Sequence, residues 1–334
     1  MNKSIDIQNK YPIPVFIFSL PRSGSTLLQR ILASHDEIET ANEPHLLIYF
    51  LNSLNSDGIL SIYDYRITSL AINDFAMSLP NKYDDYLSEI RELVIRLYAK
   101  ASTNQSKYFL DKTPKYAFVV DEIISLFNHA KFIFLWRNPL SIISSINETW
   151  RDGNWYIYHY KIDLYQGLGN LLSAYQKYNN ISLSLRYEDL ILDSTDTVKS
   201  LFAYLELPFE QNTIDNFSKI KLTGRVRDPY SDFEEYQVIR QKPLNKWRLI
   251  LTNPIRKIFC LRYLNWIGHE QLSIMGYDKD QLVNELHDTP INFHYFIQDL
   301  YRMPYGMIYN TFELRLLKQK YQSLISGNKL YSHR

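Results

Sequence analysis

The feature that most constrains the fold is a strand, a short loop and the start of a helix in residues 15–28. This segment reads VFIFSLPRSGSTLL, with β-branched and aromatic residues before the loop and an apolar run after it. Such residues favour strands, and a strand that enters a helix through small residues is typical of phosphate-binding α/β folds. The segment therefore predicts an anion-binding loop at Pro21–Thr26.

The loop differs from the usual nucleotide-binding loop, G-x-x-x-x-G-K-[ST], which uses a lysine on phosphates and a hydroxyl on Mg²⁺. It has one glycine, Gly24, no lysine, and an arginine, Arg22. Gly24 would let the backbone approach an anion, and the amides of Ser23 to Thr26 would point toward it. The hydroxyls of Ser23, Ser25 and Thr26 and the guanidinium of Arg22 would add donors. Nothing in the loop obviously holds a metal, and the alternative is an ordinary helix capped by Ser23 or Ser25.

Three short β-type runs are separated by long helix-compatible stretches, which indicates βαβ units and a parallel sheet. The runs are Val15–Ser19, Lys131–Trp136 and Ile181–Arg186. The predicted helices are Thr26–Ala33, Asp84–Ala101, Pro139–Thr149, Tyr165–Tyr178, Thr195–Leu205 and Ile255–Met275. The polar segment Lys219–Pro243 is predicted to be a long loop, and the aromatic-rich segment Ile291–Gly327 to be helical, with a hairpin as one possible form.

The composition excludes several classes of protein. The formal net charge is +1 (37 − 36), so no bulk field attracts nucleic acid. The single cysteine, Cys260, excludes an internal disulfide and a four-cysteine zinc site, and its place in the chain argues against a cysteine phosphatase. Met1–Lys10 lacks the apolar region of a secretory signal, and Ile13–Leu20 is far shorter than the about 20 residues that span a bilayer. We therefore expect no transmembrane segment and a reducing, cytoplasmic location.

A second basic segment follows another predicted strand. Residues 131–146 read KFIFLWRNPLSIISSI, with Arg137 directly after the strand and Ser145 eight residues later (145 − 137). Ligands of open parallel sheets bind at the carboxyl ends of strands, and both side chains could face one phosphate along the helix that Pro139 opens. The alternative is a capping salt bridge of Arg137 and a packing role for Ser145. Two such sites indicate a ligand with two separated anionic groups.

Together the two segments resemble those of PAPS-dependent sulfotransferases, where PAPS is 3′-phosphoadenosine 5′-phosphosulfate. In that family a P-R-S-G-[ST]-T-L segment binds the 5′-phosphosulfate, and a later R-[ND]-P…S segment binds the 3′-phosphate. This chain has PRSGSTL and RNPLSIISS in the same order. The resemblance implies a P-loop-type three-layer α/β/α domain over residues 12–280, with PAPS as co-substrate and no metal. It implies that PAPS is bound by Arg22, Ser23, Gly24, Ser25, Thr26, Arg137 and Ser145.

The resemblance also implies a general base. Glu43 lies 21 residues after Arg22 (43 − 22), at the place of the base in tyrosylprotein and bacterial members of the family. Partial burial beside Pro44 and His45 would raise the pKa of Glu43 and make it a better proton acceptor. The alternatives are a solvated loop acid at this position, and His45, two residues further on, as the base.

Three more segments match the family pattern. The segment FLDKTP resembles the one whose lysine contacts the transferring sulfuryl group, which implies a catalytic role for Lys112 beside Arg22 and Glu43. The segment LRYEDL resembles the one whose tyrosine lies near the nucleotide, which implies that Tyr187 contacts PAPS. The segment IMGYD, at Ile274–Asp278, resembles the usual end of the catalytic domain.

Two regions depart from the family pattern. The RKG-type loop of cytosolic small-molecule sulfotransferases is missing; Arg225, Arg227 and Lys242 offer basic groups that could complete the 3′-phosphate site instead. Residues 281–334 match no family segment and are predicted to form a helical, aromatic-rich C-terminal extension. This extension could mediate a homodimer or a peripheral membrane contact.

The hypothesis is therefore a sulfotransferase that moves a sulfuryl group from PAPS to an acceptor hydroxyl, with carbohydrate or a related acceptor favoured. Trp150, Trp155 and Tyr156–Tyr160 either line an acceptor pocket or pack in the core. One alternative is a Mg-nucleotide-dependent kinase or NTPase with a degenerate loop, which the missing loop lysine disfavours. Another is a non-catalytic nucleotide-binding relative, which the presence of Lys112 and Glu43 disfavours.

Overall fold

The fold is built on a five-stranded sheet whose neighbouring strands are all parallel. The computed structural model describes residues 11–54, 65–222, 239 and 241–312, with positions 314, 317, 318, 321 and 325. The strands are β1 (Ile13–Phe18), β2 (Ile38–Asn42), β3 (Tyr108–Lys112), β4 (Lys131–Trp136) and β5 (Ser182–Arg186), in the order β2-β3-β1-β4-β5. The later strands lie on both sides of β1, so the loop after β1 lies at the topological switch, where such sheets bind ligands.

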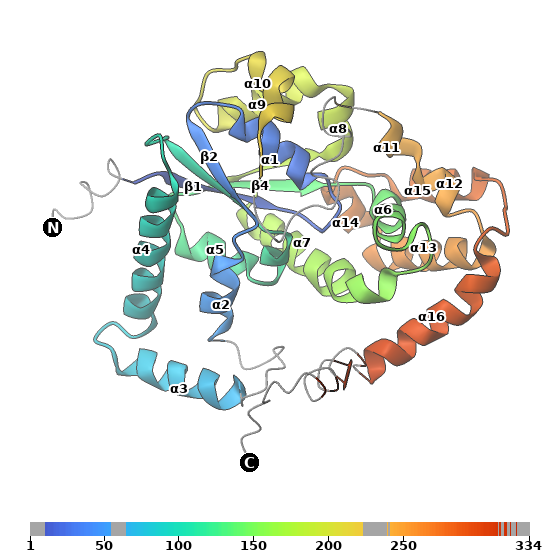
Figure 1. The fold of residues 1–334 in the computed structure, drawn as a ribbon, viewed down its shortest axis with the longest axis horizontal. Helices are drawn as coiled ribbons and strands as arrows, with labels where there is room; N and C mark the ends of the chain where they lie inside the picture. Colours follow the sequence, from blue (N-terminus) through green and yellow to red (C-terminus); the bar gives the residue numbers. More distant parts are fainter. Residues whose placement is uncertain are drawn as a thin grey trace.

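Helices cover both faces of the sheet (Figure 1), as predicted for a three-layer α/β/α fold. In β1, Val15 and Ile17 face one layer and Phe16 and Phe18 face the other, because successive side chains of a strand alternate. The aliphatic face packs against α1 (Ser25–Ala33), α8 (Tyr187–Leu192) and α9 (Ser194–Tyr204). The aromatic face packs against α2 (Leu46–Asn52), α4 (Tyr83–Ala101), α5 (Val120–Leu126), α6 (Pro139–Arg151), α7 (Leu168–Tyr178) and α13 (Pro254–Ile267).

Further helices complete the described chain. They are α3 (Tyr65–Ser78), α10 (Asn212–Asn216), α11 (Lys242–Asn245), α12 (Trp247–Ile250), α14 (His269–Ile274), α15 (Lys279–Asp288) and α16 (Phe296–Thr311). Single turns occur at η1 (Pro114–Phe118), η2 (Ile157–Tyr160), the π-helical η3 (Asp163–Gly167) and η4 (Phe217–Lys219). Most of the predicted loop Lys219–Pro243 lies outside the described residues.

The three predicted strands are confirmed, and two more strands were not predicted. β2 reads IETAN and lies at the sheet edge, so its polar, half-exposed residues lack the apolar run of a central strand. β3 reads YFLDK and is fully buried, although it ends in two charged residues. The prediction of one helix over Ile255–Met275 is wrong: Gly268, with a φ of 86°, ends α13 and separates it from α14.

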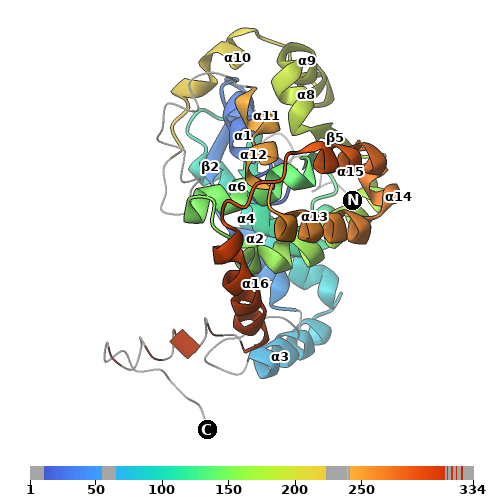
Figure 2. The same ribbon diagram turned by 90° about the vertical axis from the view of Figure 1, so that its right-hand side faces the viewer.

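The C-terminal helix α16 is fastened to the body by buried polar contacts. Asp299 accepts hydrogen bonds from Arg256 Nε and Nη2 at 2.6 and 3.0 Å, and both residues are fully buried. Further along α16, Gly306 lies against the ring of Tyr158 in η2. Figure 2 shows α16 running from α13 toward the end of the molecule where α3 lies.

The predicted boundary at residue 280 stays a prediction. Leu282 and Leu286 of α15 belong to the same apolar cluster as the aromatic face of the sheet.

The outer side of α16 exposes apolar side chains, which are Ile297, Leu300, Tyr301, Met307 and Ile308. Whether this region mediates a homodimer or a membrane contact also stays a prediction. Among the described residues, no helix is both long and apolar enough to cross a bilayer.

Candidate active site

The loop after β1 turns through two residues in the left-handed region. Arg22 has a φ of 68° and Gly24 a φ of 88°. Gly24 is the N-cap of α1, and within the described chain no side chain caps this helix, so the alternative of a cap by Ser23 or Ser25 is wrong. The first amides of a helix have no acceptor inside it. The hydroxyls of Ser23, Ser25 and Thr26 are buried at the same helix start.

Gly24 is required here for space as well as for its φ angle. A Cβ at this position would lie 2.2 Å from Cδ2 of Tyr187. On the same ring, the Arg137 guanidinium lies 4.4 Å from the centroid, within the range of a cation–π interaction. Tyr187 therefore lies between the loop after β1 and the basic residue at the end of β4.

The two basic segments contact each other directly. Arg22 Nε donates a hydrogen bond to Ser145 Oγ at 3.2 Å. In the other direction, Arg137 Nη1 donates to the backbone carbonyl of Arg22 at 2.6 Å. Residues from the ends of β1 and β4 and from α6 thus form one cluster, as expected for neighbouring parallel strands.

Glu188, which was not among the predicted site residues, supports this cluster through two hydrogen bonds. Its carboxylate accepts from the Asn138 amide at 3.1 Å and from the Tyr277 hydroxyl at 2.5 Å. The start of α6 and the IMGYD segment are thereby tied to the residue that follows Tyr187. Arg186 adds a bond to the Gly276 carbonyl at 2.9 Å. The sequence offered a signal for this contact, because LRYEDL, which contains Glu188, and IMGYD, which contains Tyr277, both resemble family segments.

Lys112 and Glu43 form an ion pair beside the loop. Lys112 is 1% exposed, and its Nζ lies 2.6 Å from Glu43 Oε1 and 3.5 Å from Thr26 Oγ1. The register explains the contact, because Asn42 at the end of β2 pairs with Lys112 at the end of β3. The structure thus brings Glu43, Lys112 and the start of α1 together.

The pKa of Glu43 is lowered, so the expectation of a raised value is wrong. Burial alone would raise the pKa, but the His45 imidazole, whose Nε2 lies 3.8 Å from Glu43 Oε2, and the charge of Lys112 outweigh it. The expected rise rested on burial alone; the effect of Lys112 depends on the pairing of β2 with β3. Glu43 is therefore ionised at neutral pH.

The turn that carries Glu43 is strained. Glu43 has a φ of 28° and His45 a φ of 54°, both unusual for residues with a side chain. Hydroxyls hold the turn: Thr113 Oγ1 accepts from the His45 amide at 3.4 Å, and the Tyr116 hydroxyl accepts from the Leu47 amide at 3.3 Å. Neither hydroxyl was predicted, although Thr113 directly follows Lys112 in the FLDKTP segment.

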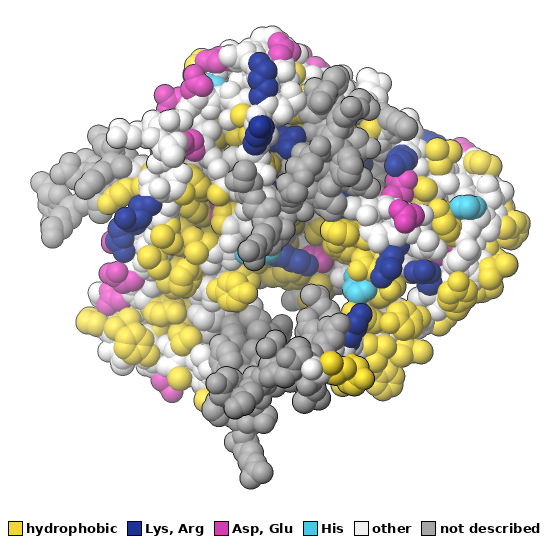
Figure 3. Space-filling view, viewed as in Figure 1, with side chains coloured by type: hydrophobic (Ala, Val, Ile, Leu, Met, Phe, Trp, Pro, Cys, Tyr) yellow, Lys and Arg dark blue, Asp and Glu magenta, His cyan; other side chains and the backbone are white. Residues whose placement is uncertain are grey.

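The aromatic segment after α6 divides between packing and the site. Trp155 is buried edge-on against Phe259, with ring centroids 4.8 Å apart, so it packs in the core. Burial raises the pKa of the Tyr160 hydroxyl, and Asp163, Arg22 and Glu43 all act on it electrostatically. Tyr160 thus lies within electrostatic range of both Arg22 and Glu43. Figure 3 shows charged and histidine side chains beside a hollow in this face, with hydrophobic side chains over α4 and α16 on either side.

The other basic residues predicted near the 3′-phosphate have no described side chain. Arg225 and Arg227 lie outside the described residues, and so does the side chain of Lys242. The start of α11 does reach the site, because the Pro243 carbonyl lies 3.5 Å from Arg137 Nη2. Among the residues described, no group of three or more His, Cys, Asp or Glu side chains could hold a metal ion.

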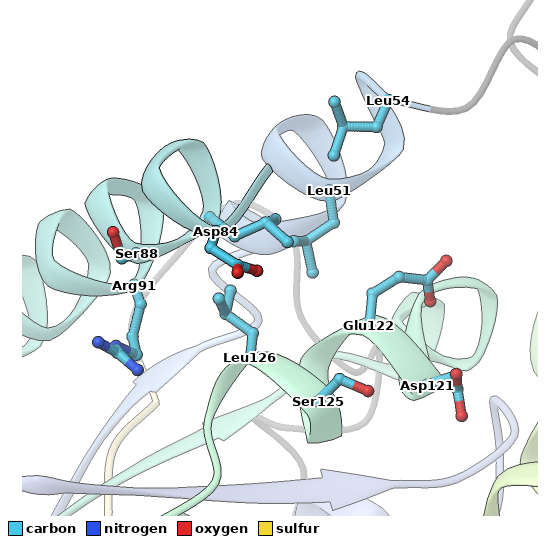
Figure 4. A pocket seen from close by; sticks show the side chains of 10 residues that line it. Leu51, Leu54, Asp84, Ser88, Arg91, Asp121, Glu122, Ser125 and Leu126 are labelled. Atoms are coloured by element: carbon cyan, nitrogen blue, oxygen red, sulfur yellow. The ribbon is translucent and has the colours of Figure 1, made fainter. Parts of the chain in front are cut away.

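A separate cavity of about 800 Å³ lies between α2, α4 and α5 (Figure 4). It is lined by leucines and by charged side chains, including Leu51, Leu126, Asp84, Arg91 and Glu122. None of its lining residues is a predicted site residue. The chemistry of the cluster at the strand ends, and not the size of this cavity, identifies the candidate site.

The chain is similar to several known proteins. "Nodulation protein NoeE" of Sinorhizobium fredii (strain NBRC 101917 / NGR234) is 33% identical over 147 residues, which are 42% of this chain and 32% of that protein. An "Uncharacterized protein" of Aquifex aeolicus (strain VF5) is 23% identical over 70% of this chain and 30% of its own length. In each of these two relatives, the aligned part is about a third of the relative's own length. "Protein-tyrosine sulfotransferase 1" of Danio rerio is 21% identical over 72% of this chain and 67% of that protein.

Solved structures share the fold. The sulfotransferase domain of the Synechococcus PCC 7002 olefin synthase has a TM-score of 0.52 and 24% identity, covering 80% of this chain and 96% of that one.

A model of the "Sulfotransferase family" matches residues 14–211. This match sets aside the kinase or NTPase alternative. Because it covers more than half of the 334 residues, the chain belongs to the sulfotransferase family.

Proposed function

We propose that this sulfotransferase moves a sulfuryl group from PAPS to an acceptor hydroxyl, with a carbohydrate or related acceptor favoured. The observation that carries the proposal is the direct contact between the two basic segments, from Arg22 to Ser145 and from Arg137 to the Arg22 carbonyl. A ligand with two phosphate groups would meet both segments at once. The 5′-phosphosulfate would contact the start of α1, and the 3′-phosphate would contact Arg137 and Ser145.

The donors at the site fit such an anion. Arg137 is 7% exposed, and its Nε has no hydrogen-bond partner among the described residues. Buried donors without a partner are costly, and a phosphate oxygen would supply the missing acceptor. The start of α1 adds amides that have no acceptor inside the helix.

The chain's own residues can then stabilise charge. PAPS supplies an activated sulfuryl group on a phosphate leaving group. Negative charge grows on that phosphate during transfer, and preorganised donors in a buried site stabilise it well. Lys112 and Arg22 provide cationic donors beside the helix start. As in phosphoryl transfer, positioning and charge stabilisation would dominate.

Glu43 would accept the proton of the acceptor hydroxyl. Its lowered pKa keeps the carboxylate ionised at neutral pH, so it is ready to act as a base. The same ion pair with Lys112 makes it a weaker base than a carboxylate with a raised pKa. Glu43 and Lys112 would therefore act as a coupled pair, with Lys112 serving the leaving group and Glu43 the acceptor.

A ligand-binding experiment tests the donor. Thermal unfolding is measured with adenosine 3′,5′-bisphosphate, with ATP and Mg²⁺, and with buffer alone. A ligand at 100 times its Kd stabilises a protein by about 2.7 kcal/mol, so adenosine 3′,5′-bisphosphate is expected to raise the Tm clearly. Stabilisation by ATP and Mg²⁺ alone would contradict the proposal.

A transfer assay tests the acceptor and the chemistry. Radiolabelled PAPS is incubated with three probes: a mixture of neutral oligosaccharides, a tyrosine-containing peptide and a small phenol. Transfer is expected to be fastest to the oligosaccharides. Faster transfer to the peptide would instead indicate that this chain is a protein-tyrosine sulfotransferase, as the zebrafish relative is named. Binding of the nucleotide without transfer to any probe would favour the non-catalytic alternative.

A further inference from the structure

A buried carboxylate that the proposed mechanism does not use lies directly behind the Glu43 turn. Asp111, in β3, has no exposed surface, and three hydroxyls donate to it. The Tyr98 and Tyr116 hydroxyls lie 2.6 and 2.8 Å from Oδ2, and Thr113 Oγ1 lies 3.2 Å from Oδ1. An ionised carboxylate can only accept hydrogen bonds. The hydrogen of each hydroxyl is therefore directed at Asp111.

Two of these three hydroxyls also hold the turn. With their hydrogens on Asp111, Thr113 Oγ1 and the Tyr116 hydroxyl offer lone pairs to the amides of His45 and Leu47. The Tyr98 hydroxyl donates to the same oxygen of Asp111 as Tyr116 does. Among the described residues, the hydrogen bond of the Tyr98 hydroxyl goes to Asp111 and none goes to the turn.

We propose that Asp111 is a positioning residue for Glu43: it orients the hydroxyls of Thr113 and Tyr116, which in turn hold the strained Glu43–His45 turn at the His45 amide and the start of α2 at the Leu47 amide. Successive residues of β3 point to opposite faces, so the end of this strand holds the turn from two sides. Lys112 holds the carboxylate of Glu43, and Asp111 holds its backbone through the two hydroxyls. This inference rests on the proposed role of Glu43 as the base.

The hydrogen bonds around Asp111 would keep the Glu43 carboxylate in place. The φ angles of 28° and 54° in the turn cost free energy and persist only where the surroundings enforce them. A base displaced by about 1 Å can lose on the order of 10²-fold in rate. Hydrogen bonds from a rigid, buried hub would limit that displacement better than contacts from a mobile surface group.

A matched pair of variants tests the proposal. Tyr116→Phe and Tyr98→Phe each remove one buried hydroxyl from Asp111 Oδ2, but only Tyr116→Phe removes an acceptor from the turn. Hydrogen exchange of the peptide spanning residues 43–48 is expected to speed up in Tyr116→Phe and to stay unchanged in Tyr98→Phe. Equal exchange in both variants would overturn the proposal. This measurement needs no acceptor.

Kinetics then connect the turn to the chemistry. With the most active of the three acceptor probes, Tyr116→Phe is expected to lower kcat about five- to ten-fold, as for the loss of one hydrogen bond, with unchanged affinity for adenosine 3′,5′-bisphosphate. In a Glu43→Gln background the same change should have no further effect, because coupled residues are non-additive. A full additional loss in that background would overturn the proposal. If Glu43→Gln alone leaves kcat unchanged, the proposed base fails, whereas the exchange result still reports on the turn.

Thr113 provides a second test that tolerates a folding problem. Thr113→Val removes the hydroxyl but keeps the shape, and Thr113→Ser keeps the hydroxyl. The valine variant is expected to lower kcat and to speed exchange at residues 43–48, and the serine variant to restore both. Equal loss in the two variants would mean that Thr113 acts through packing alone and would count against the proposal.

Discussion

The two halves of the candidate site are built differently. The donor half consists of the loop after β1 and the start of α6, whose contacts join residues inside two short motifs. The acceptor half, around Glu43, Tyr160 and η2, is assembled from segments far apart in the chain. Behind η2, Tyr158 packs against Tyr305 and Tyr309 of α16, with ring centroids 5.9 and 5.3 Å apart.

The difference suggests that the two halves have different constraints. A phosphate group can be bound by helix amides and a few cations, which a short contiguous segment provides. An acceptor must be bound by a surface shaped to it. If η2 lines that surface, as we propose, its shape depends on how α16 packs on η2. The proposed donor half thus joins two distant segments that each carry a recognisable motif, whereas the proposed acceptor half includes η2 and α16, for which no motif was recognised.

The largest expected effect separates the chemistry from donor binding. Glu43→Gln removes the proposed base, whose contribution is typically about 10²–10⁴-fold, so kcat should fall by that order. The Kd for adenosine 3′,5′-bisphosphate should change little, because Glu43 lies on the acceptor side. Transfer rates and calorimetric titration measure the two quantities. As a control, Glu92→Gln alters an exposed pair with Arg96 and should change neither. Loss of nucleotide affinity in Glu43→Gln would break the division into two halves.

The second effect concerns the attachment of α16. Asp299→Asn leaves the fully buried Arg256 without its charge partner, and breaking a buried pair typically costs about 3–5 kcal/mol. The free energy of unfolding, measured in urea, should fall by that amount. The control is Asp121→Asn, whose pair with Lys177 is more than half exposed and should be worth no more than about 1 kcal/mol.

The same variant sharpens the comparison between the halves. If α16 shapes the acceptor half, Asp299→Asn should raise the KM for the acceptor probe more than the Kd for adenosine 3′,5′-bisphosphate, at a temperature where the variant is folded. An equal change in both constants would indicate that α16 stabilises the whole molecule and has no particular link to the acceptor.

The third effect should be confined to the donor half. Arg137→Ala removes the proposed charge-assisted hydrogen bonds to the 3′-phosphate, each worth about 1.5–3 kcal/mol, so the Kd for adenosine 3′,5′-bisphosphate should rise about 10- to 100-fold. At saturating PAPS the kcat should be nearly unchanged. Lys199→Ala removes a positive charge from an exposed pair and serves as the control. A nucleotide affinity that is the same in both variants would remove Arg137 from the donor site.

The sequence predicted the parallel sheet and the meeting of the two basic segments because each segment carries a local signal. Arg22 and Arg137 follow strands with clear apolar runs, and the carboxyl ends of parallel strands meet at one edge. The lowered pKa of Glu43 could not be predicted in the same way, since it depends on Lys112, which reaches Glu43 only through the pairing of β2 with β3. β2 has no apolar run, so neither the strand nor its register was visible in the sequence.

The role of α16 was hidden for a related reason. The sequence shows that residues 281–334 are rich in aromatic residues, but aromatic residues serve cores and surfaces equally well. The pairing of Asp299 with Arg256, 43 residues earlier in the chain, decides which side of the helix is buried. Only the tertiary structure contains that information.

The smallest expected effect is a shift of the acid limb of the pH–rate profile, and it decides between the two bases. The pKa of Glu43 lies below the ordinary value of 4.5. A base works in its unprotonated form, so protonation of Glu43 itself should lower kcat/KM only below pH 4.5. A decline that begins at a higher pH would point to another titrating group, and the imidazole of His45 is the alternative base.

A limb near pH 6 would have two sources that variants can separate. Burial raises the pKa of Asp111 to about 6, so its protonation could loosen the Glu43 turn in that range. His45→Asn is a conservative test, since asparagine tolerates the left-handed conformation that His45 adopts. A limb near pH 6 that disappears in His45→Asn would make histidine the base and remove Glu43 from that role. A limb that persists there but disappears in Asp111→Asn would assign the pH dependence to the hub behind the turn, and Glu43 would remain the base.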